Sequence, residues 1–313
     1  NTTGGSNTAL GNASLSANTT GEQNTAIGRN ALLVNTTAVQ NTSVGYNSST
    51  SLTTGGSNVA VGTAALGSID TENNNTGSEN TAVGQNALIN TTASNNTAVG
   101  REALKQNTSG ASNTGVGRYA LRANTTGANN VAIGYSAGIA ITSGNKNIAV
   151  GSEALASITA NSWNIAIGEK ALYSCTSNYN TAIGQEALTT LASGNSCTAV
   201  GYKALKLNTA SSNTAVGVEA LENNSTGGNN TAIGRGSLRS TTTGGYNTAI
   251  GRDSLTTNQT GTNNTCVGMY SGFYLSSGNY NTGVGYDALQ DLSTGNSNTS
   301  LGVFSLDKLT SGS

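Results

Sequence analysis

The sequence contains no histidine and no proline, only three cysteines, and few aromatic or charged residues. Without histidine, neither a Ser-His-Asp nor a Cys-His nucleophile can be assembled, and the commonest transition-metal ligand is missing. An aromatic fraction of 4% and a charged fraction of 9% exclude a core built around large rings and a highly charged disordered polymer. We therefore expect no enzyme, no cofactor and no metal site, and a protein that buries small and β-branched side chains in thin layers.

Charge and hydrophobicity disfavour two classes of partner. The formal net charge is −1, whereas a nucleic-acid binder needs clustered Lys and Arg. No apolar run reaches the roughly 18 residues that a membrane-spanning helix requires. The sparse carboxylates are expected to be solvated surface charges and not a glycosidase pair. The sequence therefore indicates no nucleic-acid partner and no membrane span.

One short pattern, Asn24-Thr25-Ala26-Ile27-Gly28, recurs along the whole chain. Its closing glycine occurs in 18 copies, and 13 of the 17 intervals are 17 residues, three are 16 and one is 22. A nearly fixed period indicates that each copy is one structural unit stacked on the next. We predict an all-β parallel β-solenoid, or β-roll, of about 18 coils with a 17-residue repeat, and we interpret residues 1–313 as a single repeat domain that is a segment of a longer or self-stacking fibre.

The five-residue pattern is expected to be a strand, in which positions two apart share a face. The residue before the glycine is Ile, Val or Leu in all 18 copies, and the residue two before that is Thr in 14 copies and Val or Ile in four. We predict that both rows face inward and that the small residue between them faces outward. The flat outward row of Ala26, Ala82, Ala98, Ala182, Ala232 and their equivalents would then be a packing surface.

Two variable residues follow the glycine, then Ala or Ser in all copies, then Leu in 15 of 18. The Leu row should complete the interior. It fails at Ser49, Gly138 and Gly272, where Leu52, Ile139 and Phe273 could fill the layer. A helical Ala-Leu segment is the alternative, but a 17-residue unit is shorter than the strand-helix repeats. The coil closes through Asn-Thr-Thr-Gly sequences, which are typical of turns.

The Asn that opens the pattern is present in 17 of 18 copies, with Cys197 as the exception. Side-chain amides stacked at one corner can donate and accept hydrogen bonds along the stacking axis. We predict a structural Asn ladder, with a ligand-binding role as the alternative. Its representatives are Asn24, Asn96, Asn130 and Asn230.

Two features interrupt the repeat. The long interval between Gly62 and Gly84 carries Asp70, Glu72 and Glu79 and is expected to form a surface loop. The position before the ladder Asn becomes aromatic at four sites, and exposed rings can stack on sugars, although single surface tyrosines are common. The possible glycan or surface contacts are Trp163, Tyr179, Tyr246 and Tyr280.

These motifs resemble a known family. Asn-Thr-Ala-Ile-Gly with its Ala/Ser-rich continuation is similar to the repeat of YadA-like trimeric autotransporter adhesin heads, and Ala-Leu-x-x-Asn-Thr-Thr-Gly resembles repeat regions of phage tail fibres. The resemblance implies left-handed parallel β-rolls, association of three chains and a role in attachment. The 17-residue period departs from that family's usual shorter coil.

Three functions follow as hypotheses. The first is a structural fibre or adhesin segment on a cell surface or virion, extracellular, with a host-surface or matrix ligand and a homo-oligomeric state. The second is an extracellular filament subunit that stacks head to tail. The third is an ice-binding protein, which needs a flat outward Thr array, so an inward Thr row would count against it.

Overall fold

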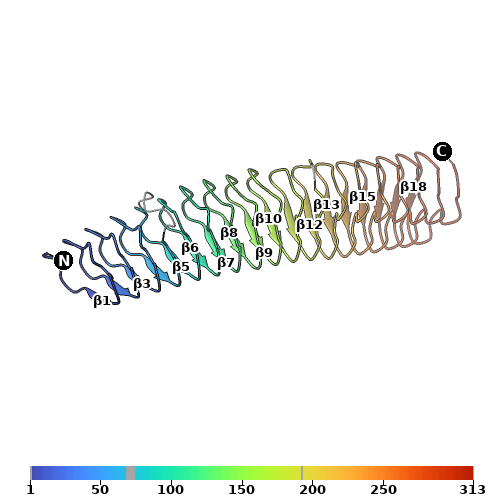
Figure 1. The fold of residues 1–313 in the computed structure, drawn as a ribbon. Helices are drawn as coiled ribbons and strands as arrows, with labels where there is room; N and C mark the ends of the chain where they lie inside the picture. The colour runs from blue at the N-terminus through green and yellow to red at the C-terminus, as the bar shows by residue number, and fades with distance from the viewer. Residues whose placement is uncertain (1, 68–74, 192, 313) are drawn as a thin grey trace. The chain divides into compact units, whose positions relative to one another are not determined.

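The computed structural model describes residues 2–67, 75–191 and 193–312. These residues form three-residue parallel strands joined by turns, without a helix. The predicted all-β parallel solenoid with a 17-residue repeat is therefore confirmed. The chain divides into two units, Asn1–Ser162 and Trp163–Ser313, and each is a stack of coils with its strands aligned along one side (Figure 1).

In each unit, one strand comes from each copy of the repeat, and consecutive strands pair in parallel. The first unit contains β1 (Thr8–Leu10), β2 (Thr25–Ile27), β3 (Thr42–Val44), β4 (Val59–Val61), β5 (Thr81–Val83), β6 (Thr97–Val99), β7 (Thr114–Val116), β8 (Val131–Ile133) and β9 (Ile148–Val150). The second contains β10 (Ile165–Ile167), β11 (Thr181–Ile183), β12 (Thr198–Val200), β13 (Thr214–Val216), β14 (Thr231–Ile233), β15 (Thr248–Ile250), β16 (Thr265–Val267), β17 (Thr282–Val284) and β18 (Thr299–Leu301).

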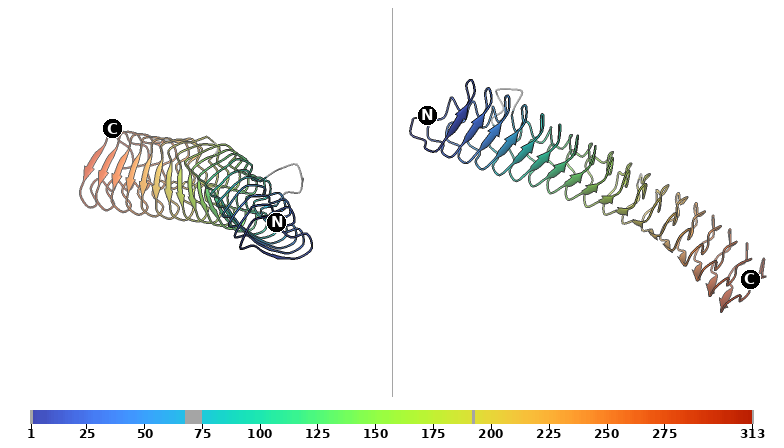
Figure 2. Two further views of the ribbon diagram at one scale, coloured as in Figure 1. Left: turned by 90° about the vertical axis from the view of Figure 1, so that its left-hand side faces the viewer. Right: turned by 90° about the horizontal axis from the view of Figure 1, so that it is seen from below.

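The register places equivalent residues above one another, so Thr25 pairs with Thr42 and Ile27 with Val44. The turns are stacked as well: the Leu32 amide donates to the Ser48 carbonyl at 3.1 Å. Because the coils bond to each other at the turns as well as in the strands, each backbone layer is held at several points of its circumference. Figure 2 shows the resulting regular rows of strands within each unit.

The backbone conformation explains why a glycine follows each strand. Gly28 has φ of 126°, which L side chains rarely adopt, and a Cβ there would lie 2.5 Å from the Gly45 carbonyl oxygen of the next coil. A side chain would therefore strain its own backbone and push the neighbouring coil away.

Orientation of the strand side chains differs from the prediction. The small middle residue is buried, as at Ala26 with no exposed surface, whereas Ile27 beside it is 36% exposed. The prediction that Thr and the aliphatic row face inward, with Ala outward, was wrong. A 17-residue coil is narrow, and the interior beside the strand accommodates only small side chains, because Ala26 shares one buried cluster with Ala31 and Leu32 of the same coil.

Two serines in one coil show that the strand and the segment after the glycine contact each other across the interior. Ser43 replaces the strand alanine and Ser48 replaces the alanine after the glycine, and their hydroxyls are 2.5 Å apart. The interior is thus two facing rows of small residues, flanked by the Leu row and by two rows of buried Asn, such as Asn24 and Asn35.

The Leu row adopts an unexpected backbone conformation. Leu32 and Leu172 both have φ of 50°, in the left-handed region that costs a non-glycine residue about 1–2 kcal/mol. Where Leu is missing, Gly138 and Gly272 have φ of 57° and 61° and adopt this conformation without a Cβ. Sequence periodicity gives no sign of a left-handed leucine, because the residue type argues against it.

The filling of the interior beside these glycines also differs from the prediction. Ile139 and Phe273 are only half-buried, and Ile141 and Leu275 are the buried residues of those coils. Leu52 is fully buried beside Ser49, as predicted. The residue that points inward is three positions after the Leu position, not one.

Candidate interaction surfaces

The outward strand face consists of two rows in each unit. One is the Thr row, and the other is the aliphatic row, whose members include Ile183 at 38% and Ile233 at 40% exposure. None of the described strands contains a charged residue, and from β2 to β18 the residue that alternates with these rows is buried. Each unit therefore presents a flat strip of β-branched side chains, which we call the strand face.

The Thr row is most regular in the second unit, where every strand from β11 to β18 begins with Thr. Among the described residues, no hydrogen bond from these strand hydroxyls to the protein is present. In the first unit, Val59, Val131 and Ile148 interrupt the row. The strand hydroxyls are thus directed to the surroundings and spaced by the distance between coils, roughly 4.8 Å.

The four aromatic residues singled out from the sequence lie in the second unit, at the turn before the ladder Asn. Trp163, Tyr179, Tyr246 and Tyr280 are 49–65% exposed, and each has φ near 60°. Trp163 and Tyr179 are stacked, with ring centroids 6.3 Å apart. Tyr246 and Tyr280 lie two coils apart, with Asn263 at the position between them. The structure brings only the first pair together, and their glycan role stays a prediction.

The Asn row at the strand entrance is buried from Asn24 to Asn281, and its side chains are hydrogen-bonded within and between coils. Asn24 donates from Nδ2 to the Ala38 carbonyl at 2.8 Å and accepts the Asn41 amide on Oδ1 at 3.0 Å. Asn130 and Asn230 repeat both contacts, while Asn96 accepts the next Asn amide and donates to the Ser94 carbonyl. These side chains face the interior, where a ligand cannot reach them.

The second buried Asn row contains several Asn-x-Thr/Ser sequences, the acceptor pattern for N-glycosylation. Asn35, Asn107 and Asn124 have no exposed surface, and Asn124 donates to Asn107 Oδ1 at 2.7 Å. A glycosylated Asn must reach solvent, so the folded coil does not present these sites.

Ionic groups gather in small clusters at the turn after the strand. In the second unit, Arg239 pairs with Glu219 and Glu222 at 3.3 and 3.2 Å. In the first unit, Glu102 contacts Arg122, Lys105 and Arg101 at 2.8, 3.4 and 3.7 Å. Burial would raise the pKa of the Glu102 carboxyl, but the Arg122 hydrogen bond and the Lys105 charge outweigh it, so this pKa is lowered.

The sequence reading overlooked this basic cluster. Arg101 and Arg118 are one repeat apart, at a position judged variable and solvated. Reading the sequence in rows of 17 would have revealed them, because residues one period apart are neighbours in a solenoid. The structure shows that these rows are in register and that the basic side chains are therefore neighbours.

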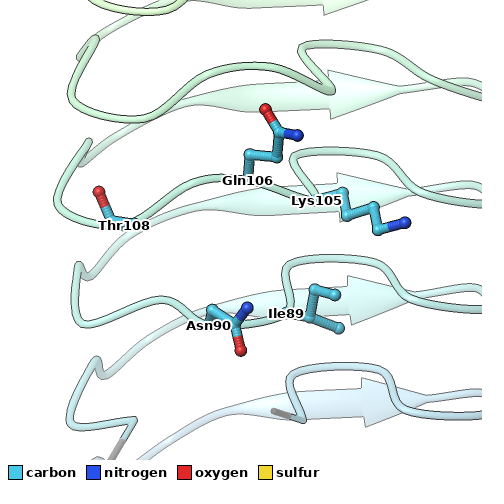
Figure 3. Close-up of a pocket in the computed structure, with 5 residues that line it drawn as sticks. All are labelled: Ile89, Asn90, Lys105, Gln106 and Thr108. Atoms are coloured by element: carbon cyan, nitrogen blue, oxygen red, sulfur yellow. The ribbon is translucent and has the colours of Figure 1, made fainter. Parts of the chain in front are cut away.

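One shallow pocket of about 320 Å³ lies on the turn side of the first unit. It is lined by Ile89, Asn90, Lys105, Gln106 and Thr108, which come from two successive coils (Figure 3). Its lining offers an ammonium group and amides but no carboxylate. The arrangement holds neither an acid-base pair nor a nucleophile with its base.

The remaining chemical groups do not converge. Within the described residues, no three His, Cys, Asp or Glu side chains are placed to share a metal ion. The thiols of Cys175, Cys197 and Cys266 are free and buried, and burial raises the pKa of Cys266 to about 11. Of the expected loop, Asp70 and Glu72 lie outside the described residues.

Comparison with known proteins adds no family assignment: no family model and no curated protein sequence matches this chain. Among the described residues, no helix has the length and apolar character needed to cross a membrane. The strand face and the exposed clusters are therefore the features on which a functional argument can be built.

Proposed function

We propose that this chain is a structural fibre or adhesin segment, displayed outside the cell or on a virion, that associates with further copies of itself through the strand face. The observation that carries the proposal is the aliphatic row. It contains Ile, Val or Leu in every one of the 18 copies, although the structure directs it outward. Extended exposed apolar strips are uncommon on monomeric proteins and mark interaction surfaces.

The energetics support this use. Complete burial of an Ile or Val side chain contributes about 1.5–3 kcal/mol. The aliphatic residue is 36% exposed or more in ten of the 18 copies and half-buried in the other eight. Where its exposure is near 40%, covering it contributes about 0.6–1.2 kcal/mol per coil. Six of the nine coils of the second unit reach at least 36% exposure and together contribute about 4–7 kcal/mol, at the lower end of the roughly 4–15 kcal/mol lost on association. Association therefore depends on the repeat being long, and the resemblance to adhesin heads implies three copies.

The solution mass tests the proposal. We expect the wild type to be a homo-oligomer by analytical ultracentrifugation, and the variant Ile183→Lys/Val216→Lys/Ile250→Lys to be monomeric. Each added ammonium group would otherwise be buried in the contact, where desolvation outweighs any gain. A head-to-tail filament would instead keep its mass in this variant.

A matched control carries the same three charges on a different side of the same unit. Thr226, Thr243 and Thr260 are exposed turn residues, and their replacement by Lys should leave the oligomer intact. A wild type that remains monomeric at high concentration, or a control that dissociates as readily as the strand-face variant, would refute association through this face.

Ice binding is the second candidate, favoured by the outward Thr row from β11 to β18. An inward Thr row would count against ice binding, but in the structure the Thr row faces outward. A monomeric wild type with thermal hysteresis activity, abolished by Thr231→Lys/Thr248→Lys, would establish this candidate in place of the first. Ice binding needs the strand face uncovered, whereas self-association covers it. The solution mass and the thermal hysteresis activity together therefore distinguish the two functions.

A further inference from the structure

Basic residues are concentrated on a small part of the first unit. Four of its six Lys and Arg residues, Arg101, Lys105, Arg118 and Arg122, fall within two successive copies of the repeat. The Tyr119 amide donates to the Arg101 carbonyl at 3.1 Å, so the Arg118 coil lies directly on the Arg101 coil. The four cations are thus neighbours in space.

This cluster has too few carboxylates. The Arg239 and Lys308 side chains of the second unit each contact two carboxylates. Among the described residues of the first unit, Arg101, Lys105 and Arg122 contact a single carboxylate, that of Glu102. Arg118 is exposed and contacts tyrosines instead. Four cations and one carboxylate leave a local charge of +3 on a chain whose net charge is −1.

Tyrosine rings complete the cluster. The Arg118 guanidinium lies 4.5 Å from the Tyr119 ring centroid and 6.0 Å from that of Tyr135, and it donates to the Tyr119 hydroxyl at 2.8 Å. The Arg122 guanidinium lies 5.4 Å from the Tyr119 ring. These contacts hold the guanidinium planes in place, so less side-chain freedom is lost when an anion binds.

We propose that Arg101, Arg118 and Arg122, with Tyr119 and Tyr135, bind an anionic saccharide that carries sulfate or carboxylate groups. Guanidinium groups bind such oxyanions through paired, charge-assisted hydrogen bonds, and the tyrosine rings can pack on the apolar face of a sugar ring. The cluster lies on three successive coils, so its length along the stack is two spacings, roughly 10 Å. Non-specific nucleic-acid binding draws on many phosphate contacts along a longer track.

Buried Glu102 is a positioning residue in this proposal. It is 7% exposed and contacts three of the cations. The inference goes beyond the proposed function, because saccharide binding requires the cluster and does not depend on how many copies associate.

The test is calorimetric titration of the wild type with a heparin-derived hexasaccharide, with neutral maltohexaose and a single-stranded oligothymidine as comparisons. We expect binding of the sulfated sugar, weakened by salt, and no binding of maltohexaose. The Arg101→Gln/Arg118→Gln variant should bind about tenfold more weakly or worse, because it loses two charge-assisted contacts.

The control Arg29→Gln/Arg235→Gln removes two arginines from the same position of the repeat elsewhere in the chain, and Arg29 also lies over a tyrosine, Tyr46, at 5.9 Å. It should retain wild-type affinity. No binding by the wild type, equal losses in the two variants, or equally tight binding of maltohexaose or oligothymidine would overturn the inference. Saccharide binding by a monomeric wild type would support this site while refuting association through the strand face.

Discussion

Neighbouring residues of β11 provide a direct test of which strand face is the interior. Ala182 has no exposed surface and lies between Ala166 and Ala199 in the adjacent strands. Ile183 is 38% exposed. We predict that Ala182→Asp is much more destabilising than Ile183→Asp, the opposite of what side-chain size suggests.

The magnitudes follow from burial. A carboxylate at position 182 has no cation within the interior, and an uncompensated buried charge costs about 3–5 kcal/mol. At position 183 the loss is the covered part of an isoleucine, roughly three fifths of 1.5–3 kcal/mol, or about 1–2 kcal/mol. The control Ser196→Asp lies on an exposed turn of the same unit and should change stability by about 0.5 kcal/mol at most.

Urea unfolding followed by tryptophan fluorescence is a suitable assay, because the single tryptophan, Trp163, stacks on Tyr179 just before β11. Its signal reports on these coils even if a repeat protein unfolds in parts. An Ile183→Asp variant less stable than Ala182→Asp would show that the aliphatic row forms the interior, and the assignment of the faces would be wrong.

Three further outcomes follow from the interior. Asn230→Ala should cost about 2–4 kcal/mol, because two bonded backbone groups lose their partners, whereas Asn223→Ala on the exposed turn should be nearly silent in urea unfolding. Leu172→Gly should be no worse than Leu172→Ala in the same assay, because glycine relieves a φ of 50°. The Cys266 thiol, with its pKa raised to about 11 by burial, should resist alkylation by iodoacetamide at pH below that value until urea unfolds the chain; rapid native labelling would contradict its burial.

The sequence predicts the architecture well because the glycine spacing alone fixes the repeat, and proline is absent from a chain whose backbone amides bond between coils. It does not predict which strand face is inside. Alternation separates two faces but does not identify the inner one. The usual assignment of large apolar residues to the interior fails because Ala26 is buried in one cluster with Ala31 and Leu32 in a narrow coil. The left-handed backbone of Leu32 escapes prediction for a similar reason, since a residue type that disfavours the conformation gives no signal.

The volume of the coil interior constrains which residues can occupy two positions of each repeat. The Leu position and the position three residues later both point inward, and the second is Asn in coils such as those of Asn35 and Asn124. In the three coils that lack Leu at the first position, the second is Leu52, Ile141 or Leu275, each fully or almost fully buried. Each coil from that of β1 to that of β17 thus keeps at least one large aliphatic side chain inside, and an interior coil without it would contain a cavity costing several kcal/mol. No such requirement acts on the outward aliphatic row, since its side chains fill no interior volume. The covered part of each of these side chains nevertheless stabilises its own coil by about 1–2 kcal/mol, and β-branched residues are favoured in strands. A second copy covering the strand face would add a reason for the exposed part to be apolar in every copy.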